Sequence, residues 1–217
     1  GHPGRVELDE VGGDLPHVFS GDDMRRMMLG ESSEELKRKT GLFTRIATKV
    51  GAATGATANL ALVRKATHTW MPLGDNIAII GGELVGIELA EFLTERGRRV
   101  NVIEEAPRLG KGLTLVRRMR ILSELADHGV GLHGGASNIA IHKDAVCFTD
   151  SKGDLQTVAA DNVIVAMGAA GDLTLADSLK AAGFTVHPIG DATGVGYIEG
   201  AMHGALAAVK AVAGTAA

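Results

Sequence analysis

A segment near the middle of the chain, IAIIGGELVGIELAEFLTERGRRVNVIEE at residues 77–105, restricts the possible folds most strongly. A short apolar run ends in a glycine turn, a helical pattern follows, and a second apolar run ends in two acidic residues. This order of strand, turn, helix, strand and acid is the one that a dinucleotide-binding βαβ unit requires. We therefore predict a parallel sheet with right-handed helical crossovers.

The pattern of alternating strands and helices continues beyond this segment, which makes the fold class α/β. We expect a Rossmann-like parallel sheet with flanking helices, an antiparallel β-meander insert at 136–159, and an N-terminal helical segment at 22–70. The expected strands are 77–80, 100–103, 130–132, 161–167 and 184–189, and the expected helices are 84–96, 113–128 and 198–212. The apolar stripes of the first two helices are predicted at Val85, Leu89, Phe92 and Leu93, and at Leu115, Met119, Leu122 and Leu125.

The glycine turn is the predicted site of the cofactor pyrophosphate. Gly81 permits a tight turn out of the strand, and Gly86 lets the helix pack close to the sheet. The first turn of that helix presents amide N–H groups and a positive dipole end to an anion. The cofactor-binding candidates here are Gly81, Gly82, Glu83, Leu84, Val85 and Gly86.

Glu83 departs from the glycine pattern, because the middle glycine of G-x-G-x-x-G falls at this position. That glycine normally lets the backbone approach the pyrophosphate. In one interpretation Glu83 turns outward and binding is weakened; in the other the site no longer binds a dinucleotide and the fold persists for structural reasons. We favour retained binding, because Glu104 would otherwise have no task.

Acidic residues near the turn indicate which dinucleotide is bound. Glu104 ends the second strand, where a carboxylate can accept hydrogen bonds from the adenosine ribose. With Glu105 it would repel a 2′-phosphate, an effect that Arg108 offsets in part, so we expect NADH rather than NADPH. Glu105 could equally be a solvated loop residue, and Glu88 could either reach the nicotinamide or complement the helix dipole.

Two later positions are also cofactor-binding candidates. Gly168 follows a buried strand, where the chain passes beneath a ligand or makes an ordinary turn. Gly190 and Asp191 follow an apolar run, and an aspartate at a strand end can hold a ribityl hydroxyl of a flavin.

Composition excludes several other classes of function. The net charge of -4 gives no basic surface for nucleic acid. No apolar run is long enough for a membrane span and no signal peptide is present, so we expect a cytoplasmic protein without membrane contact. The single Cys147 excludes a thiol–disulfide pair within the chain. His128, His133 and His142 are near one another in sequence, but no Cys or close acid pair completes a metal site with them.

The segments IIGGELVGIELAEFL, VIEEAPRLGKGL, DNVIVAMGA and VHPIGDATGVGYIEGA together resemble the C-terminal part of the NADH:flavin oxidoreductase/2,4-dienoyl-CoA reductase family, the old-yellow-enzyme-like group. The resemblance implies an FMN barrel, often with an iron–sulfur cluster, followed by an FAD domain that is split by an NAD domain. It implies hydride transfer from NADH to FAD and onward reduction of an activated C=C bond.

On this resemblance the chain divides into three parts. Residues 1–74 would be a linker and the helical end of the first FAD half, 75–183 the NAD(H)-binding Rossmann domain, and 184–217 the second FAD-half segment. The remaining FAD half-domain and the FMN barrel would be its partners in the parent protein, so we expect the chain alone to be inactive. The alternative is a Rossmann-fold interaction module whose dinucleotide site has decayed.

Overall fold

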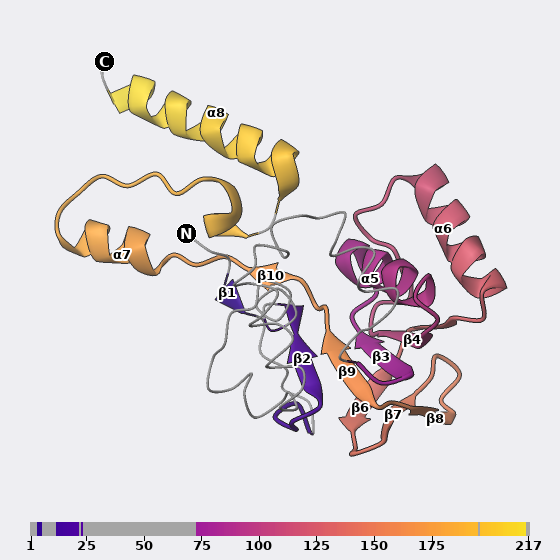
Figure 1. Cartoon of the computed structure of the whole chain (residues 1–217). Helices are drawn as coiled ribbons and strands as arrows, with labels where there is room; N and C mark the ends of the chain where they lie inside the picture. Colours follow the sequence, from indigo (N-terminus) through magenta and orange to yellow (C-terminus); the bar gives the residue numbers. More distant parts are fainter. Residues whose placement is uncertain (1–3, 6–11, 22, 24–72, 195, 216–217) are drawn as a thin grey trace, which may run out of the picture. The chain divides into compact units, whose positions relative to one another are not determined.

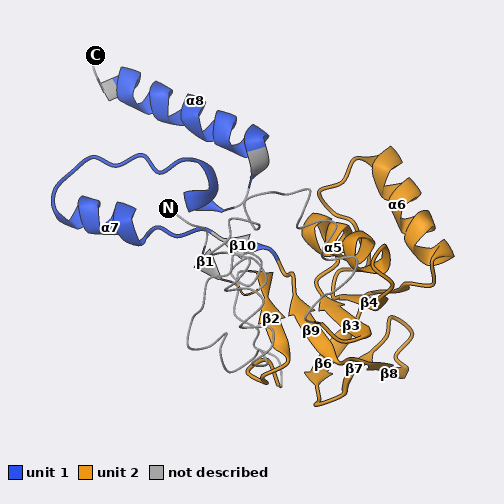
Figure 2. Ribbon diagram, viewed as in Figure 1, with its two compact units in different colours: residues 1–7, 168–217 blue, residues 8–167 orange. Residues whose placement is uncertain are grey.

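The structure is a computed structural model that describes residues 4–5, 12–21, 23, 73–194 and 196–215. The helical segment expected at 22–70 lies, apart from Asp23, outside the described residues. The chain forms two compact units, one comprising Leu8–Met167 and the other Gly1–Glu7 with Gly168–Ala217 (Figure 2). Among the described helices, none has the length and apolar character that crossing a membrane requires.

The larger unit contains the predicted parallel sheet (Figure 1). Its five strands lie in the order β2-β9-β3-β4-β5, and all pair in parallel. They are β2 (Val18–Ser20), β9 (Asn162–Val165), β3 (Asn76–Ile80), β4 (Arg99–Glu104) and β5 (Gly131–Gly134). The Rossmann-like α/β class is therefore confirmed. Strand β2 was not predicted, and it lies in the stretch that we had expected to be a linker.

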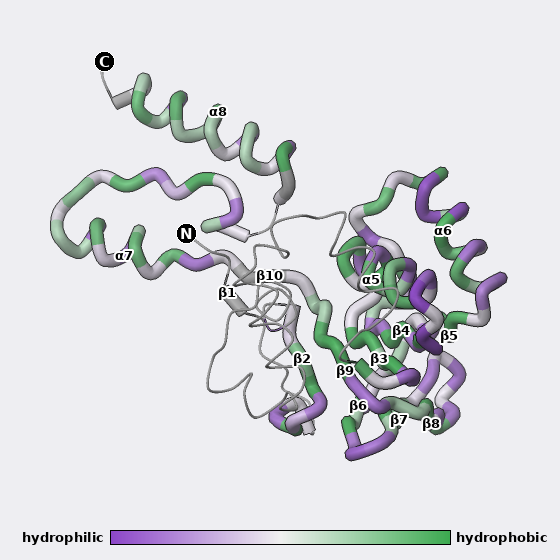
Figure 3. The backbone as a smooth tube through the Cα atoms, viewed as in Figure 1, coloured by the Kyte–Doolittle hydropathy of each residue, from purple (hydrophilic) through white to green (hydrophobic). Residues whose placement is uncertain are grey.

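The two faces of this sheet are covered by different layers. Ile77, Ile79 and Val102 belong to a buried cluster with α5 (Leu84–Thr94) and α6 (Leu115–Asp127). Ala78 and Ile80 belong to a second cluster with the antiparallel sheet of β6 (Ser137–Ile141), β7 (Ala145–Thr149) and β8 (Leu155–Ala159). Because both faces are buried, β3 is an uninterrupted apolar run rather than an alternating one. Hydrophobic residues run along β3 and β9 in Figure 3.

The predicted stripe of α5 was partly wrong. The helix buries Gly86, Ile87, Ala90 and Leu93, whereas Val85 is 57% exposed. The reason is that α5 packs against the sheet through the small residues Gly86 and Ala90. A stripe of bulky apolar side chains therefore does not indicate the buried face. Helix α6 likewise buries Ile121 and Leu125, while the predicted Leu115 and Met119 are exposed.

The smaller unit consists of a short antiparallel pair and helices. Strand β1 (Gly4–Arg5) pairs with β10 (Ala169–Ala170), and α7 (Thr174–Ala181), η2 (Gly190–Thr193) and α8 (Tyr197–Thr215) follow. The strand expected at 184–189 was wrong, because this segment is irregular. Phe184 and Ile189 are 64% and 47% exposed, and no described strand lies beside the segment to pair with its backbone.

We predict that Phe148→Ala lowers the free energy of unfolding by about 3–5 kcal/mol, because the ring is fully buried between the two sheets of the larger unit. Urea unfolding followed by circular dichroism measures the change. Phe184→Ala, at an exposed position, is the matched control and should change stability by less than about 0.5 kcal/mol. Equal losses in both variants would contradict the packing that we describe.

His133 on β5 contacts Asn101 and Phe148. Its Nε2 lies 3.2 Å from Asn101 Oδ1, and its ring centroid lies 5.0 Å from that of Phe148. Burial lowers the pKa of His133 below its ordinary value, and the charge of Asp150 opposes this shift. The folded state therefore favours the neutral imidazole.

We expect the free energy of unfolding to decrease as the pH falls below about 6.5, the ordinary histidine value, because the unfolded chain then takes up a proton that the folded chain resists. In His133→Gln this decrease should be smaller. Urea unfolding between about pH 8 and pH 5 tests the slope, with the exposed His187→Gln as the control. An unchanged slope in His133→Gln would exclude His133 as its source.

Candidate dinucleotide site

The glycine turn joins β3 to α5, and two of its glycines are required by close contacts. Gly81 has φ +105°, and a Cβ on it would lie 2.5 Å from the backbone oxygen of Ala166. A Cβ on Gly86 would overlap the backbone oxygen of Gly81. Only glycine fits at either position, so the helix begins directly against the end of β3.

The first turn of α5 offers backbone donors. Its N–H groups have no acceptor within the helix. Leu84 N–H donates to the oxygen of Lys111 at 2.9 Å, and Ile87 N–H donates to that of Glu83 at 3.0 Å. Among the described residues, no hydrogen-bond acceptor contacts the N–H groups of Val85 and Gly86. These two donors therefore remain available to an anion at the positive end of the helix.

Glu104 has a structural role that the sequence analysis did not identify. One carboxylate oxygen accepts the N–H of Gly82 at 2.6 Å, and the other accepts the N–H of Ala106 at 2.7 Å. The side chain thus links the glycine turn to the loop that follows β4. Each carboxylate oxygen has a second lone pair, so a ribose hydroxyl could still donate to it. Glu105 is exposed, as is Arg108.

The loop at 106–113 covers the start of α5. Gly110 N–H donates to the oxygen of Gly82 at 2.6 Å, and Gly135 N–H donates to that of Ala106 at 3.0 Å. A Cβ on Gly82 would lie 2.9 Å from Cδ2 of Leu109 and 3.0 Å from Cβ of Glu104. The loop therefore packs closely against Gly82, and a larger residue there would require the side chain of Leu109 to move.

Glu83 is paired with a lysine from the same loop. The Nζ of Lys111 lies 3.0 Å from the Oε1 of Glu83, and the two side chains are 78% and 38% exposed. The backbone of Glu83 is extended, with φ -75° and ψ -167°, a conformation open to any residue. Nothing in the spacing of the sequence pointed to Lys111.

Glu88 also has a partner that was not predicted. Its Oε1 accepts a hydrogen bond from Arg117 Nη2 of α6 at 2.9 Å, so the carboxylate is held toward the second helix. Arg117 also lines a cleft of about 480 Å³ between α5 and α6, and no residue of the glycine turn does. None of the residues that line this cleft is therefore a candidate for dinucleotide binding.

The later candidates belong to the smaller unit. Gly168 has φ +83°, and Gly190 has φ +66° at the start of η2. Asp191 is exposed, and its backbone oxygen accepts the N–H of Gly194 at 3.3 Å. Gly190 and Asp191 thus form a tight turn before α8 rather than the end of a strand.

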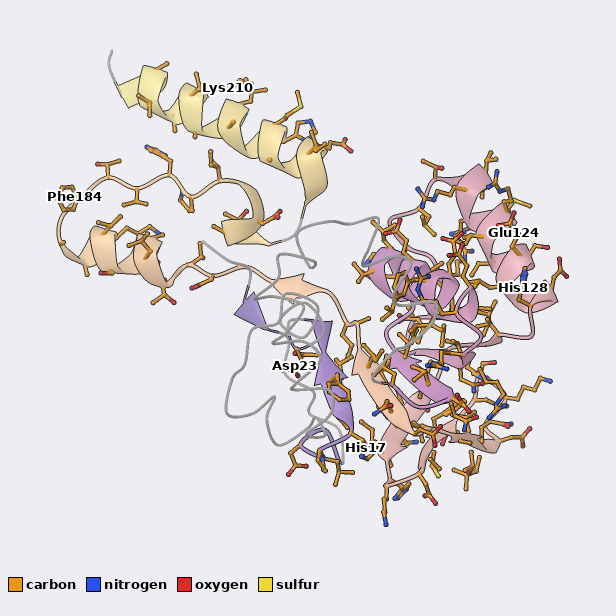
Figure 4. All side chains as sticks on the ribbon, in the orientation of Figure 1. His17, Asp23, Glu124, His128, Phe184 and Lys210 are labelled. Atoms are coloured by element: carbon orange, nitrogen blue, oxygen red, sulfur yellow. The ribbon has the colours of Figure 1, made fainter. Side chains whose placement is uncertain are left out.

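Two of the histidines that are close in sequence, His128 and His142, contact different partners. His128 Nδ1 lies 2.6 Å from the backbone oxygen of Glu124 on α6, where Figure 4 labels both residues. The backbone oxygen of His142 lies 2.9 Å from His17 Nε2 instead. No group of three His, Cys, Asp or Glu side chains suited to a metal ion occurs among the residues that the structure describes.

Residues 40–194 match the family described as pyridine nucleotide-disulphide oxidoreductase. The chain belongs to this family. The match covers the glycine turn, Glu104 and Asp191. Because this chain has one cysteine, Cys147, it does not itself supply a thiol pair for disulfide chemistry.

Two curated relatives are similar over the same region. The chain is 28% identical over 130 residues to an NADH oxidase of Thermoanaerobacter brockii, which covers 59% of this chain and 20% of that protein. It is 31% identical over 124 residues to a bilirubin reductase of Mediterraneibacter gnavus, which covers 57% of this chain and 19% of that protein. The chain spans about a fifth of the length of these relatives.

Solved structures share the fold. A 2-naphthoyl-CoA reductase superposes with a TM-score of 0.62 at 22% identity, covering 94% of this chain and 24% of that one. A histamine dehydrogenase from a Rhizobium species superposes with a TM-score of 0.61 at 16% identity, covering 95% and 28%. At these identities the similarity establishes the fold alone.

We predict that Glu104→Gln lowers the free energy of unfolding by about 1–3 kcal/mol, because an amide has a single oxygen and leaves one of the two N–H groups facing its NH₂. Chemical unfolding measures the loss. Glu105→Gln removes the same charge from the adjacent exposed residue and should change stability by less than about 0.5 kcal/mol. A similar result for both variants would mean that the two hydrogen bonds contribute nothing to stability.

Proposed function

We propose that this chain provides the nicotinamide-dinucleotide-binding domain of an NADH-dependent flavoprotein reductase. The observation that carries the proposal is the pair of available N–H groups, Val85 and Gly86, on a helix that begins directly against a glycine turn. Membership of the pyridine nucleotide-disulphide oxidoreductase family supports the same ligand. These N–H groups would bind the pyrophosphate, and Glu104 would accept hydrogen bonds from the adenosine ribose.

The residues fit such a ligand at the turn. A Cβ on Gly81 or Gly86 would distort the start of α5, so these glycines fix the direction in which its N–H groups point. When bound, NADH would supply a hydride. The role of this chain would be to bind and orient the dinucleotide. We assign no acid, base or nucleophile to the site.

We propose that NADH would pass a hydride to FAD, and that electrons would then pass through an iron–sulfur cluster to FMN and reduce an activated C=C bond on domains outside this sequence. The resemblance to the NADH:flavin oxidoreductase/2,4-dienoyl-CoA reductase family supports this narrower assignment, whereas the NADH oxidase and bilirubin reductase relatives support an oxidoreductase in general. An FMN and an iron–sulfur cluster in the parent protein are part of the same proposal. Gly190 and Asp191 would then contact the FAD, together with the other FAD half-domain.

A second candidate is an interaction module that no longer binds a dinucleotide. Glu83 favours it, because this residue brings a carboxylate to the position of the middle glycine. The hydrogen bonds of Glu104 to Gly82 and Ala106 are consistent with it too, because they require no ligand. Direct binding measurements separate the two candidates.

We expect the chain to bind NADH about tenfold more tightly than NADPH, which corresponds to about 1.4 kcal/mol. Glu104 places negative charge where the additional phosphate would lie, whereas Glu105 is exposed. Isothermal titration calorimetry with both nucleotides, at a temperature where every variant is folded, measures the ratio of the two dissociation constants. Glu104→Gln should narrow it and Glu105→Gln should leave it unchanged. Binding of neither nucleotide at millimolar concentration would favour the interaction module.

A further inference from the structure

Lys111 contacts the start of α5 through both its backbone and its side chain. Its backbone oxygen accepts the N–H of Leu84 at 2.9 Å, and its Nζ lies 3.0 Å from Glu83 Oε1. Gly110 and Gly112, on either side of it, have φ +74° and +91°, so the loop turns sharply on both sides of the lysine. The loop at 106–113 therefore holds one positive charge beside the first turn of the helix.

The charge balance at this turn differs from that of a glycine-only motif. Glu83 adds a negative charge next to the predicted pyrophosphate position, and a like charge there would oppose binding. Lys111 neutralises that charge in the absence of ligand. Because both side chains are partly exposed, this ion pair is screened by solvent and contributes little to stability, so separating Lys111 from Glu83 costs little.

We propose that Lys111 is a pyrophosphate-binding residue that exchanges Glu83 for the phosphate when the dinucleotide binds. The pyrophosphate carries more negative charge than one carboxylate, and it would approach from the side where the N–H groups of Val85 and Gly86 are available. Glu83 then keeps the lysine in place when the ligand is absent and competes with the ligand for it. This inference rests on the proposed dinucleotide binding and assigns a specific cation to it.

The test is a titration of NADH into the wild-type chain, Lys111→Ala, Glu83→Gly and the double variant. We expect Lys111→Ala to weaken NADH binding about tenfold in both backgrounds, and Glu83→Gly alone to tighten it. Lys180→Ala is the matched control, because Lys180 forms a comparable exposed pair with Asp177 at 3.3 Å in the smaller unit. Loss of this cation should also make NADH binding less sensitive to salt.

Three results would overturn the proposal. If Lys111→Ala does not weaken NADH binding, or weakens it only in the background that retains Glu83, the lysine does not bind the phosphate itself. If Lys111→Ala loses NADPH binding but keeps NADH binding, the side chain of Lys111 faces the 2′-phosphate instead of the pyrophosphate. If neither the wild type nor Glu83→Gly binds NADH, the proposed function fails together with this inference, a pattern distinct from the first two.

Discussion

The contact between Gly86 and the backbone of Gly81 determines the geometry of the candidate site. Because no Cβ separates them, α5 starts against the end of β3, and its first N–H groups lie at the carboxyl edge of the sheet. The same closeness gives α5 its buried face of small residues, Gly86 and Ala90, and sets the depth at which Ile87 and Leu93 pack. The position of the helix dipole therefore follows from two glycines rather than from any polar side chain.

The loop after β4 determines what that helix end can bind. It uses the N–H of Leu84, holds Gly82 through Glu104 and Leu109, and brings Lys111 to Glu83. These contacts connect residues that are more than twenty positions apart in sequence. An acid at the end of the second strand is usually read as a ribose ligand, yet here the same carboxylate also fixes the turn that would hold the phosphates.

The sequence was sufficient to predict the parallel sheet, its crossovers and the antiparallel meander, because both faces of the sheet are buried and leave strong apolar patterns. The sequence did not predict features that leave no periodic pattern of apolar residues. Strand β2 has three residues, too few for a pattern, and the segment at 184–189 is apolar but has no described strand beside it. The ion pairs of Glu83 with Lys111 and of Glu88 with Arg117 join separate segments, so no local spacing could indicate them.

The structure also changes the argument for dinucleotide binding. Sequence alone favoured retained binding because Glu104 would otherwise have no task, and the hydrogen bonds to Gly82 and Ala106 give it one that needs no cofactor. The presence of Glu104 therefore no longer separates a working site from a decayed one. The remaining support for binding comes from the N–H groups of Val85 and Gly86. They lie at the positive end of a helix, and no acceptor contacts them among the described residues. A bound pyrophosphate would accept hydrogen bonds from both groups.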